Sequence, residues 1–263
     1  MNYNRELKEL KNWYTDYVQS FYTDDTEFNH NLDIKNYHTL RVCKEILDVG
    51  TSLKLNSEQL QTAEIIALLH DVGRFKQFEK YKTSVDRHSE NHASLGVKVI
   101  RINNVLNGID DNKRELILCA VAHHNKMEMP VDLPEECKFF TKLLRDADKL
   151  DIWRVCTDYY ADKNKVKNDY IELGLSDSPE TSEEVCKDLL KGSYVRTVNL
   201  QSLNDFKLLQ MGWVYDINFR RSFQIIRERE YLQKIYTVLP HTNIVNEIYA
   251  KLEAYLDEKC VYR

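Results

Sequence analysis

Histidine and aspartate residues recur along this chain in an order that could build a metal centre. The series comprises His38, the adjacent pair His70-Asp71, His92, the adjacent pair His123-His124, and Asp148. Neutral imidazoles and carboxylates are good ligands for divalent transition metals such as Mn, Fe, Co, Ni and Zn. We therefore expect one or two such ions as cofactors, held by side chains that lie far apart in the sequence.

The His70-Asp71 pair is the most informative member of the series. It ends an apolar segment with the sequence ALLHDVGR. A carboxylate at the end of an apolar helix is costly to bury unless a metal ion or another cation compensates its charge. Any one of the other histidines, taken alone, fits a structural or surface role better. The pair therefore predicts that the centre lies where this helix ends.

Hydrophobic periodicity predicts helices around most of these residues. Apolar residues at i, i+3 and i+4 spacing predict helices over 4–21, 33–48, 57–70, 91–106, 112–124 and 135–160. The segment 72–90 lacks regular periodicity and is rich in charged and aromatic residues, which favours an ordered loop. We expect short helices over 161–198. A stronger helical pattern follows over 199–260, with a break at Leu239-Pro240.

Composition favours an all-α fold. The 263 residues include only seven Gly and four Pro, whereas all-β and doubly wound folds use these residues for turns and phosphate loops. Hydrophobic residues make up 43% and charged residues 30%, as in globular proteins. We expect 1–263 to be a single all-helical unit, with a metal-binding core over about 25–160. No Gly/Ser linker precedes about 161–263, which should form a C-terminal helical lobe packed on the core.

Charge and cysteine content limit the partners. The net charge is −5 and no long basic run occurs, so we expect no nucleic acid polymer as a partner. The six cysteines are scattered without a CxxC pair, which predicts reduced, mostly buried thiols in a cytoplasmic protein. The N-terminal segment lacks the apolar region of a signal peptide, and no apolar run approaches the ~18 residues of a membrane span. A homo-oligomer is compatible with these features.

The ordered motifs together resemble the HD-domain superfamily of metal-dependent phosphohydrolases. The segments NYHTLRV, LLHDVGR, AVAHH and DADKLD resemble the family's successive metal-binding motifs, over about 30–155. The resemblance implies an HD-domain helical bundle whose metal ligands include His38, His70, Asp71 and Asp148. The family pattern in DADKLD places the ligand at Asp148, with Asp146 and Asp151 on the helix surface or behind the ligands.

Two further histidines resemble those of family members that hold two metals. His92 and His124 would then bind a second ion, with Asp71 as the ligand common to both ions. Alternatively, the two histidines are polar residues behind the ligands. The A-x-x-x-H spacing from Ala120 points to His124 as the ligand. His123 differs from it by about 100° in direction on a helix, so it would face the substrate or have no role at the centre.

Basic residues next to the expected ligands suggest an anionic substrate. The resemblance implies that Arg74 and Lys149 contact a phosphate group and that His123 or His92 protonates the leaving oxygen. Lys35, one helical turn before His38, fits a surface lysine. The function implied is hydrolysis of a phosphoester in a small phosphorylated substrate, a nucleotide, by water that the metal activates.

Two other functions fit the same residues. Some HD-fold proteins with six similar ligands hold two irons and oxidise small molecules with dioxygen. A regulatory module that binds a nucleotide without turnover is a third possibility, which the apparently complete ligand set disfavours. Arg74 and Lys149 favour hydrolysis, because both would bind an anion. The glycine-rich extension of cyclic dinucleotide phosphodiesterases is absent after His124, where NKMEMP follows.

Overall fold

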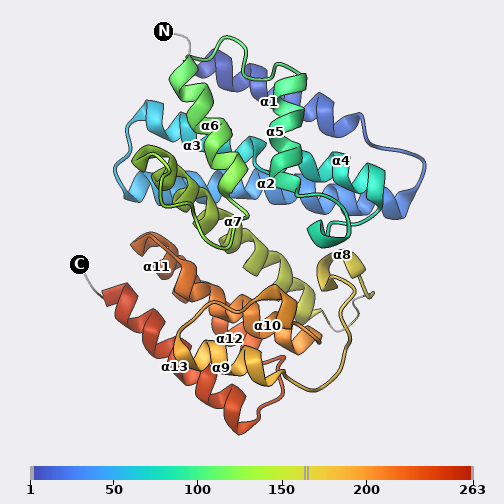
Figure 1. Ribbon diagram of the computed structural model, residues 1–263, viewed down its shortest axis with the longest axis vertical. Helices are drawn as coiled ribbons and strands as arrows, with labels where there is room; N and C mark the ends of the chain where they lie inside the picture. Colours follow the sequence, from blue (N-terminus) through green and yellow to red (C-terminus); the bar gives the residue numbers. More distant parts are fainter. Residues whose placement is uncertain (1–2, 163, 165, 262–263) are drawn as a thin grey trace. The chain divides into compact units, whose positions relative to one another are not determined.

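Helices make up the regular secondary structure of the computed structural model, which describes residues 3–162, 164 and 166–261 (Figure 1). No strand is formed within these residues, so the predicted all-α fold class is confirmed. The chain divides into two compact units, Met1–Asp148 and Lys149–Arg263. The division falls inside one long helix, α7 (Glu135–Ala161). Within the described ranges, no helix combines the length and the apolar character needed to cross a membrane.

The first unit is a bundle that brings several helix ends together. Its elements are α1 (Tyr3–Gln19), α2 (Thr26–Ser52), α3 (Ser57–Leu69), α4 (Val72–Tyr81), η1 (Asp86–His88), α5 (His92–Ile102), α6 (Asp111–His123) and the first part of α7. Helix α2 packs along α3, α4 packs along α5, and both α3 and α5 contact α6 (Figure 1). Fully buried aliphatic and aromatic side chains, including Ile46, Ile66, Phe75 and Ile117, fill the spaces between these helices.

The second unit has a core of its own. After the end of α7 it contains α8 (Asp169–Glu172), α9 (Glu183–Lys191), η2 (Thr197–Asn199), α10 (Leu203–Gly212), η3 (Trp213–Asp216), α11 (Arg220–Glu228), α12 (Tyr231–Tyr236) and α13 (Asn243–Val261). Helices α9, α11 and α12 pack against α13. The fully buried Trp153 stacks on Tyr231 and donates a hydrogen bond from Nε1 to the carbonyl oxygen of Gln210, at 2.9 Å. The predicted break at Leu239-Pro240 falls between α12 and α13.

Side-chain caps set the starts of the helices that carry the predicted ligands. The Asp25 carboxylate accepts hydrogen bonds from the backbone amides of Glu27 and Phe28, so α2 begins well before the predicted residue 33. Asn56 and Gln59 form a reciprocal capping box at the start of α3. Both caps satisfy backbone donors that would otherwise lack a partner, and they fix where each helix starts.

The segment 72–90 is not the loop that its sequence suggested. It forms α4 and then the short η1. Val72, Phe75 and Phe78 lie three residues apart on α4, and all three are buried. This apolar stripe spans fewer than three turns among many charged residues, which is too short to stand out as periodicity. The correction matters because α4 begins directly after Asp71 and thereby fixes its position.

The prediction that all six cysteines are reduced is also wrong. Cys119 on α6 and Cys137 on α7 form a disulfide, with their Cα atoms 6.2 Å apart. Cys43, Cys156 and Cys186 are buried and not disulfide-bonded, as expected. The pair is separated by 18 positions in the sequence, and only the turn between α6 and α7 brings the two sulfurs together. Such pairing cannot be derived from cysteine spacing alone.

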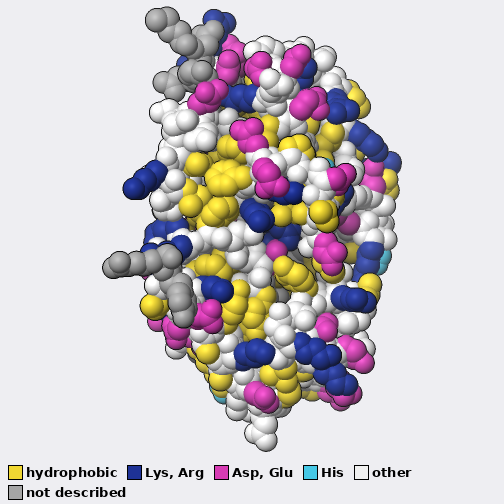
Figure 2. All heavy atoms as spheres, turned by 60° about the vertical axis from the view of Figure 1, so that its left-hand side comes forward, with side chains coloured by type: hydrophobic (Ala, Val, Ile, Leu, Met, Phe, Trp, Pro, Cys, Tyr) yellow, Lys and Arg dark blue, Asp and Glu magenta, His cyan; other side chains and the backbone are white. Residues whose placement is uncertain are grey.

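Charged side chains of both signs are mixed on one face of the protein. On the face drawn in Figure 2, Lys and Arg side chains lie among Asp and Glu side chains. No single-sign patch dominates that face, in keeping with the low net charge of −5.

Candidate metal centre

The structure gathers the predicted ligands around Asp71 in the first unit. Helix α2 carries His38, the junction between α3 and α4 carries His70 and Asp71, α5 begins with His92, His124 follows the last residue of α6, and α7 carries Asp148. Each side chain therefore projects from a helix or from its end rather than from a long loop. Such supports hold side chains in fixed positions.

One oxygen of the Asp71 carboxylate faces a first group of side chains. Asp71 Oδ2 lies 3.7 Å from His38 Nε2 and 3.4 Å from His70 Nε2. Asp148 Oδ1 lies 3.0 Å from His38 Nε2 and 3.7 Å from His70 Nε2. We call these four residues the first ligand group. Ligand atoms of its His38, His70 and Asp71 lie within 4.8 Å of one another, which is close enough to surround one ion.

The other oxygen of Asp71 faces a second group. Asp71 Oδ1 lies 3.5 Å from His92 Nε2 and 3.9 Å from His124 Nε2, and the two imidazole nitrogens are 3.1 Å apart. Ligand atoms of Asp71, His92 and His124 again lie within 4.8 Å of one another, and we call them the second ligand group. The two oxygens of one carboxylate thus face two different pairs of imidazoles. This is the arrangement that a carboxylate shared by two ions requires.

Backbone hydrogen bonds orient the imidazoles. His70 Nδ1 donates to the carbonyl oxygen of Ala67 at 2.6 Å, and His124 Nδ1 donates to that of Val121 at 2.8 Å. Because Nδ1 carries the proton, the lone pair of Nε2 points into the cluster. His70 Nε2 is buried and has no hydrogen-bond partner among the described residues. A buried acceptor without a donor is unfavourable, and a divalent metal bound to that nitrogen would remove the deficit.

His92 is oriented by a carboxylate instead. Asp86 Oδ2 lies 2.8 Å from His92 Nδ1. The same carboxylate accepts hydrogen bonds from Arg74 Nη1 at 2.8 Å, Gln77 Nε2 at 2.9 Å and Asn125 Nδ2 at 3.2 Å. Burial alone would raise the pKa of Asp86, but its contacts with His92 and Arg74 hold that pKa below its ordinary value. Sequence analysis missed Asp86, because it lay in the segment predicted as a loop.

A close approach of two helices places His92 beside Asp71. Gly73, in the first turn of α4, lies against the backbone of α5. A Cβ atom at this position would overlap the carbonyl oxygen of His92 and the amide nitrogen of Gly96. Only glycine therefore allows the starts of α4 and α5 to approach so closely.

Charges around the cluster keep its groups in forms that bind metals. Burial on its own raises the pKa of Asp71, but the Lys35 ammonium and His70 bring that pKa well below its ordinary value. Lys35 Nζ lies 2.7 Å from Asp71 Oδ2, and its side chain is only 17% exposed, so it is not a surface lysine. Burial, together with His92 and His70, lowers the pKa of His124 to about 3, so this imidazole stays neutral near neutral pH.

Arg74 and Lys149, the two cations predicted to contact phosphate, have protein partners. Arg74 Nη1 contacts Asp86, and its Nε lies 3.7 Å from Asp71 Oδ1. Arg74 therefore helps to hold the carboxylate that orients His92. In the second unit, Lys149 Nζ lies 2.7 Å from Asp216 Oδ2. Phosphate contacts of these two residues stay predictions.

His123 belongs to neither of the two ligand groups. Its Nδ1 donates to the carbonyl oxygen of Cys119 at 2.8 Å. His124, its neighbour, is the one that lies in the cluster. Asp146 and Asp151 are both fully buried, so neither lies on the helix surface. The role of His123 as a proton donor stays a prediction.

Replacing Asp86 by asparagine should weaken metal binding at the second ligand group. Asp86→Asn removes the negative charge that polarises His92 through Nδ1. We expect metal affinity to fall by about 10- to 100-fold, as for other residues that orient metal-binding histidines. Metal titration by calorimetry measures the change. The control is Glu90→Gln, because the Glu90 carboxylate contacts Tyr81 and nearby lysines instead of His92. Equal affinities in the two variants would rule out this role for Asp86.

A comparison with known protein families identifies a domain in the segment that contains this cluster. The family model of the HD domain matches residues 36–153, a range that includes both ligand groups. No curated protein and no solved structure matches the chain. HD domains bind divalent metals and act in general as metal-dependent phosphohydrolases. Residues 36–153 are therefore an HD domain, as their motifs suggested.

Proposed function

We propose that the chain is a phosphohydrolase that requires two divalent transition-metal ions and cleaves a phosphoester of a small phosphorylated substrate, a nucleotide. The observation that carries the proposal is the position of Asp71. Its Oδ2 faces His38 and His70, and its Oδ1 faces His92 and His124. Two ions bridged by this carboxylate would have three protein ligands or more each, with positions left for water and substrate.

The first ligand group would hold one ion and the second ligand group the other. Bound there, divalent ions supply Lewis acidity that lowers the pKa of water towards neutrality and offsets charge on phosphoryl oxygens. The chain's own residues orient the ligands. Ala67 and Val121 hold His70 and His124 through their carbonyl oxygens, and Asp86 holds His92. These contacts fix the cluster before any substrate binds, which removes a reorganisation cost from the reaction.

Cations at the cluster support an anionic substrate. Lys35 and Arg74 both contact Asp71 and are each 17% exposed, so solvent and small molecules can reach them. The carboxylates of Asp86 and Asp148 also lie at the cluster, so bound ions would be needed to make the site positive overall. Additional positive charge from the ions would favour a substrate with several negative charges, such as a nucleotide phosphate.

A metal and substrate screen tests this function. The protein is stripped with a chelator and reloaded separately with Mn, Fe, Co, Ni or Zn, and bound metal is counted. Each form is then incubated with nucleoside mono-, di- and triphosphates and with non-nucleotide phosphoesters, and released phosphate or nucleoside is measured. We expect turnover of a nucleotide by at least one metal form that contains two ions.

Other results of the same screen would support different functions. Two bound irons with oxygen consumption on adding a non-phosphorylated small molecule would indicate the oxygenase. Tight nucleotide binding without product in every metal form would indicate a regulatory module. Turnover of phosphoesters other than nucleotides would support a phosphohydrolase but contradict the proposal that its substrate is a nucleotide.

Removing the Lys35 charge should weaken substrate binding without weakening metal binding. The Lys35 ammonium and an ion in the first ligand group compete for the same Asp71 Oδ2. In Lys35→Met we therefore expect metal affinity to be unchanged or higher. The KM for the phosphorylated substrate should rise about 10-fold or more, because a charged hydrogen bond is lost.

Metal titration and steady-state kinetics on the same preparations measure both effects. Lys44→Met, which changes an exposed lysine farther along α2, is the control and should alter neither value. Weaker metal binding with an unchanged KM would contradict the proposed role of Lys35.

A further inference from the structure

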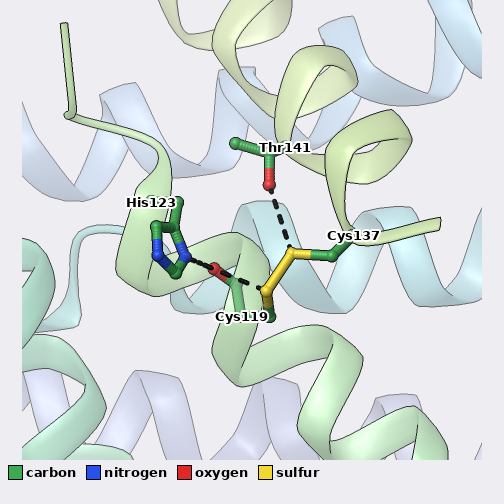
Figure 3. Close-up of a disulfide and its surroundings, with 4 residues drawn as sticks. All are labelled: Cys119, His123, Cys137 and Thr141. Carbon is green, nitrogen blue, oxygen red and sulfur yellow. Dashed lines mark hydrogen bonds between the residues drawn. A yellow bond between two sulfur atoms is a disulfide. The ribbon is translucent and has the colours of Figure 1, made fainter. Parts of the chain in front are cut away.

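A second cluster of metal-binding side chains lies next to the disulfide. Cys119 and His123 on α6 and Cys137 at the start of α7 place their ligand atoms within 4.8 Å of one another (Figure 3). Cys137 is buried, whereas Cys119 and His123 are half-buried and within reach of solvent. The cluster shares no residue with the two ligand groups around Asp71.

We propose that Cys119, His123 and Cys137 form a separate site for a thiophilic divalent ion such as Zn²⁺ when their disulfide is reduced. We call these residues the thiol-imidazole cluster. Two thiolates and one imidazole are a set that zinc prefers, and a water molecule from solvent can fill the fourth position. The proposal does not depend on the function of the Asp71 centre.

The positions of the residues fit such an ion. Cys119 and His123 are four residues apart on α6, so their side chains share one face of the helix. Cys119 Sγ lies 3.8 Å from His123 Nδ1. A tetrahedral zinc with bonds of about 2.3 Å to sulfur and about 2.0 Å to nitrogen would separate these two atoms by about 3.5 Å. The observed separation is therefore close to what the ion needs, before any movement of the helix.

Reduction of the disulfide would supply the two sulfur ligands. A dithiol reductant transfers two electrons and two protons to the disulfide, releasing Cys119 and Cys137 as thiols while it closes into its own disulfide. The sulfurs can then separate by rotation about their Cα–Cβ bonds. Binding of the ion releases the two thiol protons to solvent. His123 gives up its hydrogen bond to the Cys119 carbonyl, and its proton moves from Nδ1 to Nε2, so that Nδ1 can bind the ion.

Thr141 is a neighbour that can stabilise the reduced form of Cys137. Thr141 Oγ1, which lies 3.8 Å from Cys137 Sγ, is the other side chain drawn beside the sulfurs in Figure 3. Its hydroxyl can donate a hydrogen bond to a thiolate and thereby stabilise the ligand form of Cys137. His124 points about 100° away from His123, so an ion in the thiol-imidazole cluster need not disturb the second ligand group.

Cobalt binding tests the proposal without relying on enzyme activity. The full chain is prepared in an oxidised form and in a form reduced with a dithiol, from which excess reductant is removed under argon. Co²⁺ is then added to each form. We expect the reduced form to bind one more equivalent than the oxidised form and to gain thiolate-to-cobalt charge-transfer absorption. The imidazoles and carboxylates around Asp71 cannot produce that absorption. Added Zn²⁺ should displace this cobalt.

Variants assign the absorption to the cluster. Cys119→Ser should lose both the additional equivalent and the absorption, and His123→Ala should bind the ion at least about 10-fold more weakly. The matched control is Cys260→Ser, which changes a free cysteine of the second unit and should keep both signals. The proposal is overturned if reduced wild-type protein binds no additional equivalent, or if Cys119→Ser keeps the absorption. The comparison of oxidised and reduced wild-type protein decides even if a variant fails to fold.

Discussion

Asp71→Ala should abolish metal binding at both ligand groups and lower kcat/KM by on the order of 10³-fold or more. One carboxylate faces all four imidazoles of the cluster, at 3.4 Å to 3.9 Å from their Nε2 atoms. Its loss removes a ligand from each group and also the negative charge that offsets two cations. Water has a pKa of about 15.7 in bulk and about 7 only on a suitable metal, so activity without bound ions should be very low.

Metal analysis and steady-state kinetics on the best substrate measure this effect. Asp16→Ala, at an exposed aspartate of α1, is the matched control and should keep full metal content and activity. Circular dichroism of both variants verifies that the helices are formed. Substantial turnover by Asp71→Ala, or two ions still bound to it, would contradict the proposed centre.

The parts of the fold that sequence predicted best are long helices with regular apolar spacing. The predicted segment 57–70 matches α3, and 135–160 matches α7, because many turns repeat the same buried stripe. Helix α4 was missed, since its buried stripe of Val72, Phe75 and Phe78 spans fewer than three turns. Pattern recognition needs repetition, whereas folding needs only enough buried surface to hold a short helix in place.

The candidate centre was predictable to the extent that its residues form motifs. His70 and Asp71 are neighbours in the sequence, and their shared position at a helix end already suggested a metal site. Asp86 and Lys35 have no such signal, because their roles come from contacts across the fold. Asp86 reaches His92 from the short η1, and Lys35 reaches Asp71 from α2. Residues that orient ligands are therefore harder to read from one sequence than the ligands themselves.

The disulfide, too, depends on a contact across the fold that one sequence does not predict. Cys119 and Cys137 lie on separate helices, and the connector between them carries two prolines and no periodic signal. Their proximity depends on how α6 and α7 turn against each other, which composition does not encode. The same turn brings His124 and Asp148 to the metal centre. Helices α6 and α7 therefore supply both metal ligands near Asp71 and the residues of the thiol-imidazole cluster.

His124→Ala should reduce the bound metal from two ions to one and lower kcat by about 10²-fold or more. The change removes one imidazole of the second ligand group and leaves His92 and Asp71 as its remaining members. The first ligand group, with His38, His70 and Asp148, is untouched and should keep its ion. Because two-metal hydrolases stabilise both the attacking and the leaving oxygen, loss of one ion should affect kcat more than KM.

Metal counting by mass spectrometry and kinetics on the same sample test this expectation. The control is His241→Ala, which removes an exposed imidazole stacked on Tyr236 in the second unit. If wild-type protein and His124→Ala each bind one ion and have the same kcat, His92 and His124 are polar neighbours of a centre with one ion. If His124→Ala retains two ions and normal kcat, the second ion does not depend on His124 and the proposed second ligand group is wrong. If it loses both ions, the two groups bind metal cooperatively, since the bridging Asp71 carboxylate couples them. A single remaining ion with low activity is the result that the geometry around Asp71 predicts.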